Sequence, residues 1–337
     1  MAVKMSNNQK KSIVSGMRVS GRIHLGNYHG ALKNWLQLQH THECYFFAAD
    51  WHALTTNYEN PQGIAQQSRL MIQDWLAAGL DPQLCNIFIQ SGVPEHAELH
   101  LILSMMTPLS WLERVPTYKD QQEKLKDKNL STYGFLGYPL LQSADILIYK
   151  ANLVPVGEDQ VSHIELTREI ARRFNHIAGK VVLPEPGALL TKESKFPGLD
   201  GQKMSKSYNN TITLTEDPVS VTDKIKKMPT DPARVKRTDP GDPNKCPVWS
   251  LHKIYSSPDV LQWADKGCRT AGIGCLACKR PLIDSILAEQ KPIIERYKEI
   301  EANPGYVDKI LAESTEKARQ VAKQTLAEVN TVMGIAY

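Results

Sequence analysis

The first half of the chain alternates short apolar segments with longer amphipathic ones, and this alternation restricts the fold more than any other feature. Residues 12–17, 43–49 and 86–90 have the length and apolar content of strands, and helical patterns lie between them. Because a parallel pair of strands needs a crossover, usually a helix, the order predicts a parallel sheet covered on both faces. Right-handed crossovers would make this α/β architecture a Rossmann-like, doubly wound sheet. The segments expected to complete it are helices at 27–39, 61–79, 95–112, 138–150 and 158–174 and a strand at 153–156.

The pattern changes beyond about residue 215, where helical segments follow one another without a convincing strand. A chain of 337 residues is long enough for two domains. We therefore expect a catalytic domain at residues 1–214 and an all-helical domain at residues 215–337. The helices expected in the second domain are 220–228, 248–256, 282–300 and 307–332.

Composition argues against a membrane protein. No apolar run approaches the ~20 residues that a spanning helix needs, and the polar residues 1–11 contain no apolar signal core. We therefore expect a cytoplasmic location and no membrane partner. The net charge of +4 is too small to indicate a nucleic-acid binder by itself. Basic residues do gather between positions 224 and 237, either as a solvated surface or as a contact for a phosphate backbone.

The first candidate functional motif is the stretch Lys203-Met204-Ser205-Lys206-Ser207. Its two lysines lie among small hydroxyl side chains, which suits a loop that follows a polyphosphate. A lysine ammonium is a flexible point charge that can stabilise a phosphate whose charge changes during reaction. In isolation, the same pattern would equally describe a solvated basic turn.

A second motif lies near the N-terminus, where the first strand should give way to a helix. Gly21 and Gly26 permit close approach of the backbone, His24 can donate to a phosphate oxygen, and Asn27 offers an amide at the start of the helix. Ligands of a doubly wound sheet bind at this carboxyl edge of the strands. Together with the lysine loop, the motif predicts a nucleotide phosphate site.

These two motifs resemble the two signatures of class I aminoacyl-tRNA synthetases. Asn27 replaces the second histidine of the first signature, as in the tryptophanyl branch, and the stretches 144–149, 154–160 and 163–168 resemble that branch as well. The resemblance covers nearly the whole chain. It implies that tryptophan carboxylate attacks the α-phosphate of ATP, pyrophosphate leaves, and the tryptophanyl group passes to tRNA(Trp). It also implies a homodimer and Mg²⁺ bound to the phosphates.

The resemblance also implies roles for individual residues. Positioning and charge stabilisation would carry the activation step, with His24, Lys203 and Lys206 acting on the transition state. The residues expected to bind ATP are Arg18, Val19, Ser20, Gly26, Asn27, Gly157, Glu158, Asp159, Met204, Ser205 and Ser207.

The amino-acid pocket should contain a group that accepts a hydrogen bond without donating one, because indole offers one N–H and no acceptor. Asp145 lies among apolar neighbours, where an unpaired charge would be costly. It is either paired with a nearby Arg or backbone amide or, as the resemblance implies, accepts from the indole N–H. The other residues expected in the pocket are Gln160, His52, Val154 and Val156, of which His52 could equally be a structural histidine.

Two positions depart from the pattern of the tryptophanyl branch. Gln142 stands where many relatives carry methionine, and this would change one wall of the pocket. Gln121 stands where relatives often supply a lysine for the phosphates, and Lys124 could take that role only if the loop shifts.

Four cysteines, Cys246, Cys268, Cys275 and Cys278, lie near one another late in the chain. Disulfides are rare in the cytoplasm, and four thiolates can hold either tetrahedral zinc or a 4Fe–4S cluster. Zinc sites more often use two Cys-x-x-Cys pairs, and this chain has one. Its similarity to a subset of bacterial tryptophanyl-tRNA synthetases favours the 4Fe–4S cluster, with zinc as the alternative.

Two other functions fit part of the sequence. A tyrosyl-tRNA synthetase would share fold and chemistry but needs a pocket for a phenol hydroxyl. A synthetase paralogue could serve as an RNA-binding or iron–sulfur sensing module, although the presence of His24, Lys203 and Lys206 argues against lost catalysis.

Overall fold

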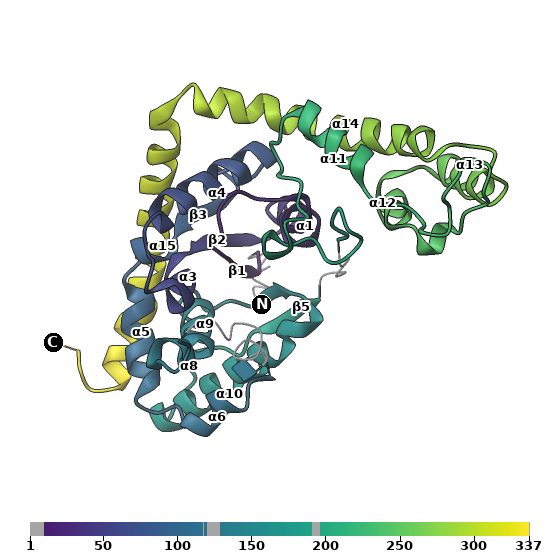
Figure 1. The fold of residues 1–337 in the computed structure, drawn as a ribbon. Helices are drawn as coiled ribbons and strands as arrows, with labels where there is room; N and C mark the ends of the chain where they lie inside the picture. Colours follow the sequence, from purple (N-terminus) through teal and green to yellow (C-terminus); the bar gives the residue numbers. More distant parts are fainter. Residues whose placement is uncertain (1–9, 117, 120–128, 191–195, 337) are drawn as a thin grey trace, which may run out of the picture.

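The computed structural model describes residues 10–116, 118–119, 129–190 and 196–336. Its centre is a five-stranded sheet in the order β3-β2-β1-β4-β5, in which every pair of neighbours is parallel (Figure 1). This is the Rossmann-like, doubly wound arrangement predicted from the sequence. The strands are β1 (Ser12–Arg18), β2 (Glu43–Ala49), β3 (Cys85–Ile89), β4 (Leu153–Val156) and β5 (Gly187–Leu190).

The two faces of the sheet are buried by different helices. Side chains alternate along β2, so that Phe46 belongs to one apolar cluster and Phe47 to the other. On the first face Trp35 stacks on Phe46, with ring centroids 4.5 Å apart, and meets Trp75 edge to face. The helices of that face are α2 (Lys33–Leu38) and α4 (Ile64–Ala78), and those of the other are α5 (Glu95–Ser104), α9 (Tyr138–Leu147) and α10 (Val161–Ala178).

The helix expected at 27–39 is interrupted by a π-helical turn. Its parts are α1 (Leu25–Asn27), the π-helical segment η1 (Tyr28–Leu32) and α2. His24 and Asn27 form a capping box at its start, because the side chain of each accepts from the backbone N–H of the other at 3.3 Å. Such π turns occur frequently at functional sites.

The helix expected at 95–112 is also two helices, because α5 ends before Pro108 and α6 (Leu109–Glu113) begins after it. The sequence analysis did not predict α3 (Asp50–Asn57), which follows β2 without a loop, nor the short helix α8 (Tyr133–Leu136). Among the described residues, no helix is long and apolar enough to cross a membrane.

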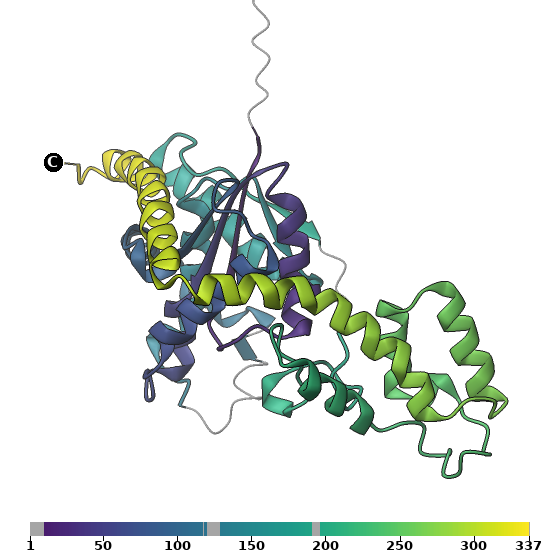
Figure 2. The same cartoon turned by 90° about the horizontal axis from the view of Figure 1, so that it is seen from above.

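Beyond residue 215 the described chain contains helices and no strand, as expected, and one of them, α13, was not predicted. Its helices are α11 (Pro218–Lys227), α12 (Pro247–Tyr255), α13 (Pro258–Arg269), α14 (Cys275–Glu301) and α15 (Pro304–Val332). Helices α11 to α13 extend away from the sheet, and α14 runs back toward it (Figures 1 and 2).

Helix α15 packs on the sheet side of the molecule rather than with the other late helices. It lies against β3 and α5, and Ala318, Ala322 and Val329 are fully buried in the same apolar cluster as Phe47. The last helix therefore completes the core around the sheet. The division into domains at residue 214 remains a prediction.

Candidate active site

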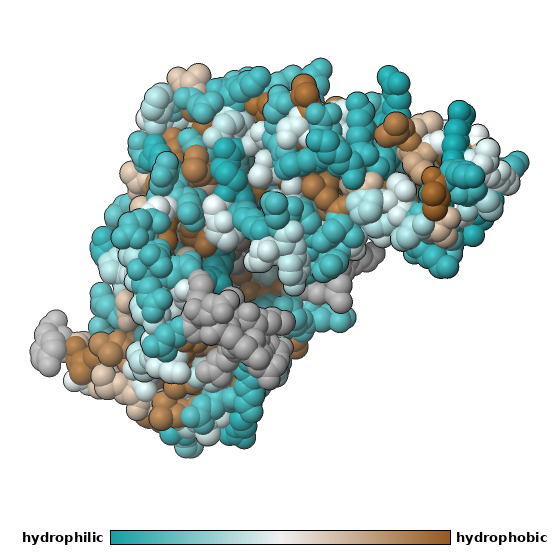
Figure 3. Space-filling view, in the orientation of Figure 1, coloured by the Kyte–Doolittle hydropathy of each residue, from teal (hydrophilic) through white to brown (hydrophobic). Residues whose placement is uncertain are grey.

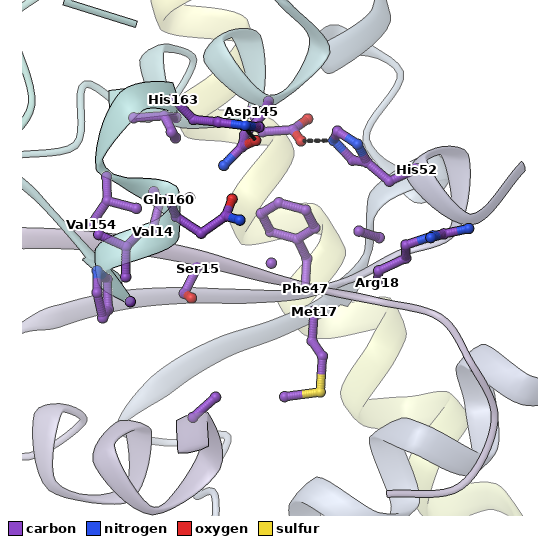
Figure 4. A pocket seen from close by; sticks show the side chains of 18 of the residues that line it. Val14, Ser15, Met17, Arg18, Phe47, His52, Asp145, Val154, Gln160 and His163 are labelled. Atoms are coloured by element: carbon purple, nitrogen blue, oxygen red, sulfur yellow. Dashed lines mark hydrogen bonds and ion pairs between the residues drawn. The ribbon is translucent and has the colours of Figure 1, made fainter. Parts of the chain in front are cut away.

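A cavity of about 380 Å³ opens where β1 lies between β2 and β4 (Figure 4). This is the point at which strand order reverses, and ligands of open α/β sheets bind outside the strand ends there. The cavity is bordered by β1 and β4 and by side chains of α9 and α10. Its volume lies in the range of small-molecule sites.

The structure brings one group of predicted residues to this cavity. Those that line it are Arg18, His52, Asp145, Val154, Val156, Gly157 and Gln160. Figure 4 shows Gln160 and His52 on opposite sides of the opening, with Asp145 at its inner end and the ring of Phe47 between them. Gly16 is required beside this ring, because a Cβ there would lie 2.5 Å from Phe47 Cζ.

Asp145 is buried and receives hydrogen bonds from three side chains. His52 Nε2 lies 2.9 Å from Oδ2, and His96 Nδ1 lies 2.7 Å from Oδ1. The amide of Gln90 donates to both oxygens, at 2.8 and 3.0 Å. The sequence analysis considered a nearby Arg or a backbone amide as the partner of Asp145, and neither is among these contacts.

These contacts keep the carboxylate ionised. Burial alone would raise the pKa of Asp145, but the hydrogen bonds and charge interactions with His52 and His96 outweigh it and hold the pKa well below its usual range. The site therefore presents an acceptor that does not donate at physiological pH.

Gln142 and His163 form a polar pair on another wall of the cavity. Both line it, and Gln142 Oε1 lies 2.5 Å from His163 Nδ1. Burial lowers the pKa of His163 to about 4, so the imidazole is neutral near pH 7. With its proton on Nδ1, His163 donates to the Gln142 carbonyl oxygen.

The second group of predicted residues lies where the lysine loop meets the first motif. Lys206 Nζ donates to the carbonyl oxygen of Ser20 at 2.5 Å. A Cβ on Gly26 would lie 3.0 Å from the His24 ring and 3.3 Å from Met204 Cβ, so a larger residue would have to push these side chains apart.

Backbone pairing holds the same two segments together. Leu25 N donates to Ile212 O at 2.9 Å, and His24 forms an isolated bridge with Thr213. The side chain of Lys203 is exposed. The other predicted ATP residues do not border the central cavity; they are Val19, Ser20, Asn27, Glu158, Asp159, Ser205 and Ser207.

Electrostatics at this junction favour neutral histidine and a readily titrated lysine. Desolvation, helped by the charge of Lys206, lowers the pKa of His24 to about 4. Desolvation also lowers the pKa of Lys206 to about 8, with Asp74 opposing the shift and Arg22 adding to it. Arg22 itself is tied to Asp74 by hydrogen bonds of 2.8–3.1 Å.

The four late cysteines surround one small cavity of about 30 Å³, away from the sheet. All four are free thiols in the structure, and they share the cavity with Arg234 and Lys279. Burial raises the pKa of the Cys278 thiol to about 12. Within the described ranges, no three His, Cys, Asp or Glu side chains are arranged to hold a metal ion.

Comparison with known proteins identifies the family. The model of the family described as "tRNA synthetases class I (W and Y)" matches residues 6–332. The chain belongs to the class I tRNA synthetases for tryptophan and tyrosine. Two similar proteins of this synthetase family are the tryptophan–tRNA ligases of Ralstonia nicotianae and Thermotoga maritima. Each is 51% identical to this chain, and each alignment covers 96% of this chain. The alignments cover 98% of the Ralstonia protein and 99% of the Thermotoga protein.

A solved structure agrees with this placement. The tryptophanyl-tRNA synthetase of Campylobacter jejuni, complexed with ADP and tryptophan, covers 96% of this synthetase and 99% of its own chain. Its sequence is 31% identical, and the TM-score is 0.86. The family and its tryptophanyl branch, predicted from the sequence, are thereby confirmed.

Sequence reasoning missed part of the synthetase site. Gln90 follows directly after β3, so its position at a strand end was a usable signal. His96 lies at the start of α5, where nothing local indicates that it is buried against Asp145. Gln121 and Lys124 lie outside the described residues.

Proposed function

We propose that this synthetase is a tryptophan–tRNA ligase that forms tryptophanyl-adenylate from L-tryptophan and ATP and then charges tRNA(Trp). The observation that carries the proposal is the buried, ionised Asp145 at the inner end of the cavity. An ionised carboxylate accepts from the indole N–H and has no proton to donate. The similarity to tryptophan–tRNA ligases over nearly the full chain supports the same reaction.

On the amino-acid side, the indole ring would occupy the cavity with its N–H toward Asp145. Val154 and Val156 are buried β4 residues on the cavity wall, and the Phe47 ring borders the same space. These apolar walls favour an aromatic ring. We assign Gln160, at the opening, to the amino or carboxylate group of tryptophan.

On the ATP side, His24, Lys203 and Lys206 would stabilise the charge that develops on pyrophosphate as it leaves. A tryptophan carboxylate oxygen forms the new bond to the α-phosphorus, and the bond from that phosphorus to the pyrophosphate oxygen breaks. Mg²⁺ held by the phosphates would supply further charge neutralisation. Lys206 donates to the carbonyl oxygen of Ser20, next to the first motif, and this contact supports a phosphate site between the two segments.

The remaining ATP residues are proposed from the elements on which they lie. Arg18, Val19, Ser20, Gly26 and Asn27 lie at the strand end and the first helix, which suits phosphate and base contacts. The others proposed are Gly157, Glu158 and Asp159 for the ribose and Met204, Ser205 and Ser207 in the loop; Met204 is buried and acts through packing.

We also propose that the four cysteines hold a 4Fe–4S cluster. All four thiols line one cavity together, as the thiolates around a single metal group do. Zinc is the alternative occupant. Buried Arg234 and Lys279 offset the negative charge of such a group.

The cluster proposal is tested by iron, sulfide and zinc analysis of protein purified without oxygen. We expect equal amounts of iron and sulfide, lost in Cys278→Ser and retained in Cys85→Ser, which changes a buried thiol of β3. Stoichiometric zinc without iron would contradict the proposal. A structural role is expected, because the cysteines connect α12, α13 and α14.

The oligomeric state and the cellular location are also proposals. We propose a homodimer that pairs through α5 and α6, where Leu101, Met105 and Leu109 are exposed. Apolar side chains are visible at the end of the molecule where α6 lies (Figure 3). Sedimentation of the purified protein tests the dimer. We further propose that residues 215–337 contact tRNA and that the protein acts in the cytoplasm.

One assay separates the candidate functions. Tryptophan-dependent exchange of pyrophosphate into ATP, with tyrosine as the control amino acid, should be followed by charging of tRNA(Trp). We expect exchange and charging with tryptophan alone. Exchange without charging would favour the paralogue, and exchange with tyrosine alone would favour a tyrosyl enzyme.

A further inference from the structure

The carboxylate of Asp145 lies between the cavity and a closed interior. His52 approaches it from the cavity side, where the His52 side chain is 14% exposed. Gln90 and His96 approach from the other side, and both are completely buried. Neither of these two borders the cavity.

His96 is itself held by a second buried side chain. Its Nε2 lies 2.7 Å from the hydroxyl oxygen of Tyr149. The Tyr149 ring stacks on Tyr45, with centroids 4.5 Å apart, and lies beside Phe88. His96 and Tyr149 are both buried, so their contact is shielded from solvent.

The direction of the proton chain follows from these contacts. Burial and the nearby charge of Asp145 raise the pKa of Tyr149 well above its usual value, so the phenol keeps its proton. The ionised carboxylate of Asp145 can only accept, so the His96 nitrogen that faces it, Nδ1, carries a proton. From there it is donated to Asp145 Oδ1.

We infer that His96, anchored by Tyr149, is a positioning residue for the indole acceptor: it holds Oδ1 of Asp145 from the closed side, while Oδ2, which Gln90 also contacts, is the oxygen that faces the cavity side and the ligand. This inference rests on the proposed function. Oδ2 is the oxygen that His52 contacts from the cavity. The indole N–H therefore takes or shares the place of His52, while His96 stays fixed.

The alternative is that His96 only fills the core and satisfies a buried charge. The two roles differ in what they do to a substrate without the N–H. A packing defect lowers activity toward tryptophan and toward its benzothiophene analogue, in which sulfur replaces the N–H, by the same factor. A misplaced acceptor lowers activity toward tryptophan alone, so the ratio of the two kcat/KM values is the informative quantity.

The test measures this ratio by ATP–pyrophosphate exchange in full-length wild-type enzyme, His96→Leu and His96→Asn. We expect His96→Leu to reduce the ratio about 10- to 100-fold, because a hydrogen bond to a charged group is misaligned. His96→Asn should keep the ratio within about 3-fold, since its amide N–H can replace the Nδ1 donor. An equal loss for both substrates in His96→Leu would overturn the inference.

A second variant covers the case in which His96→Leu does not fold. Tyr149→Phe keeps the stacked ring and removes only the hydroxyl that anchors His96. It should lower the ratio about 3-fold or more, and an unchanged ratio would again overturn the inference. Failure of the proposed function looks different: the wild-type enzyme would then show no tryptophan-dependent exchange, or no preference for tryptophan over the benzothiophene analogue.

Discussion

His29 Nε2 and Glu289 Oε2 lie 2.9 Å apart, which joins the π-helical turn after the first motif to helix α14. Tyr255 donates to the same carboxylate oxygen at 2.8 Å, and Lys33 donates to the other at 3.1 Å. The His29 ring also stacks on Phe196, 4.7 Å away, in the segment that leads to the lysine loop. The Glu289 carboxylate thus connects the helix that follows the first motif with α12 and α14, and His29 extends the contact to the segment before the lysine loop.

The first prediction concerns Glu289→Gln. Burial would raise the pKa of Glu289, but hydrogen bonds from His29 and Tyr255 outweigh it, and the pKa lies below its usual value. We expect the variant to lose about 1–3 kcal/mol of unfolding free energy at pH 7, because the buried partners lose a charged acceptor. Urea unfolding measures this loss.

The pH dependence of that loss has a definite sign. A carboxylate with a depressed pKa contributes stability above its unfolded pKa and loses it as pH falls through the folded value. The difference between wild type and Glu289→Gln should therefore shrink on the acid side of pH ~4.3. Glu328→Gln, at an exposed pair with Lys150, is the control and should change little. A difference that grew on acidification would contradict the assignment.

The second prediction concerns Gly16→Ala. The new methyl group would lie 2.5 Å from the Phe47 ring, which must move. Since Phe47 borders the cavity, the KM for tryptophan should rise, and stability should fall by about 1–3 kcal/mol. Exchange kinetics and thermal unfolding measure the two effects. Gly134→Ala is the matched control, because no atom lies within 4 Å of the added Cβ; equal effects of both variants would refute the steric cause.

The third prediction concerns Asp145→Asn. The amide can turn its NH₂ toward the indole N–H, and it faces the donors of His52, His96 and Gln90 with one acceptor fewer. We expect kcat/KM for tryptophan to fall on the order of 100-fold, with a smaller change in the KM for ATP. Exchange assays with tryptophan and tyrosine measure this, and unchanged discrimination between the two amino acids would exclude the role of indole acceptor.

The fourth prediction concerns proton uptake by Lys206. Its pKa of about 8 in the free enzyme should rise when ATP phosphates bind beside it. The contribution of the Lys206 charge to ATP affinity is fully present below the pKa of Lys206 in the free enzyme. It is lost as the pH rises through the higher pKa of Lys206 in the ATP complex. Calorimetry in buffers of different ionisation enthalpy, about one unit above the free pKa, should detect proton uptake on ATP binding.

Lys206→Arg supplies the control for this measurement. Arginine stays protonated throughout the pH range of the experiment, so the variant should take up no proton at position 206 when ATP binds. Protons bound or released by ATP itself contribute equally in both proteins and cancel in the comparison. Equal uptake by wild type and variant would show that Lys206 does not titrate on binding.

Several elements could be predicted because their patterns are local. β2 and β4 have the predicted bounds, since apolar runs of strand length buried on both faces leave little choice. β5 escaped prediction because Gly187–Leu190 is a short edge strand with half of its side chains exposed, and its pairing with β4 decides its conformation. The break in the helix at 95–112 was a missed local signal, since Pro108 lies within that segment.

The sequence by itself determined the alternation of strands and helices and the positions of the two motifs proposed to bind phosphate, and it offered Asp145 as a candidate acceptor for an indole. Periodicity reports which face of an element is buried, and motif spacing reports which residues share a loop. Only the tertiary structure decided that His96, Gln90 and His52 surround Asp145, and that Glu289 meets His29. These contacts join residues far apart in the chain, and their geometry depends on how whole elements pack, which no local pattern encodes.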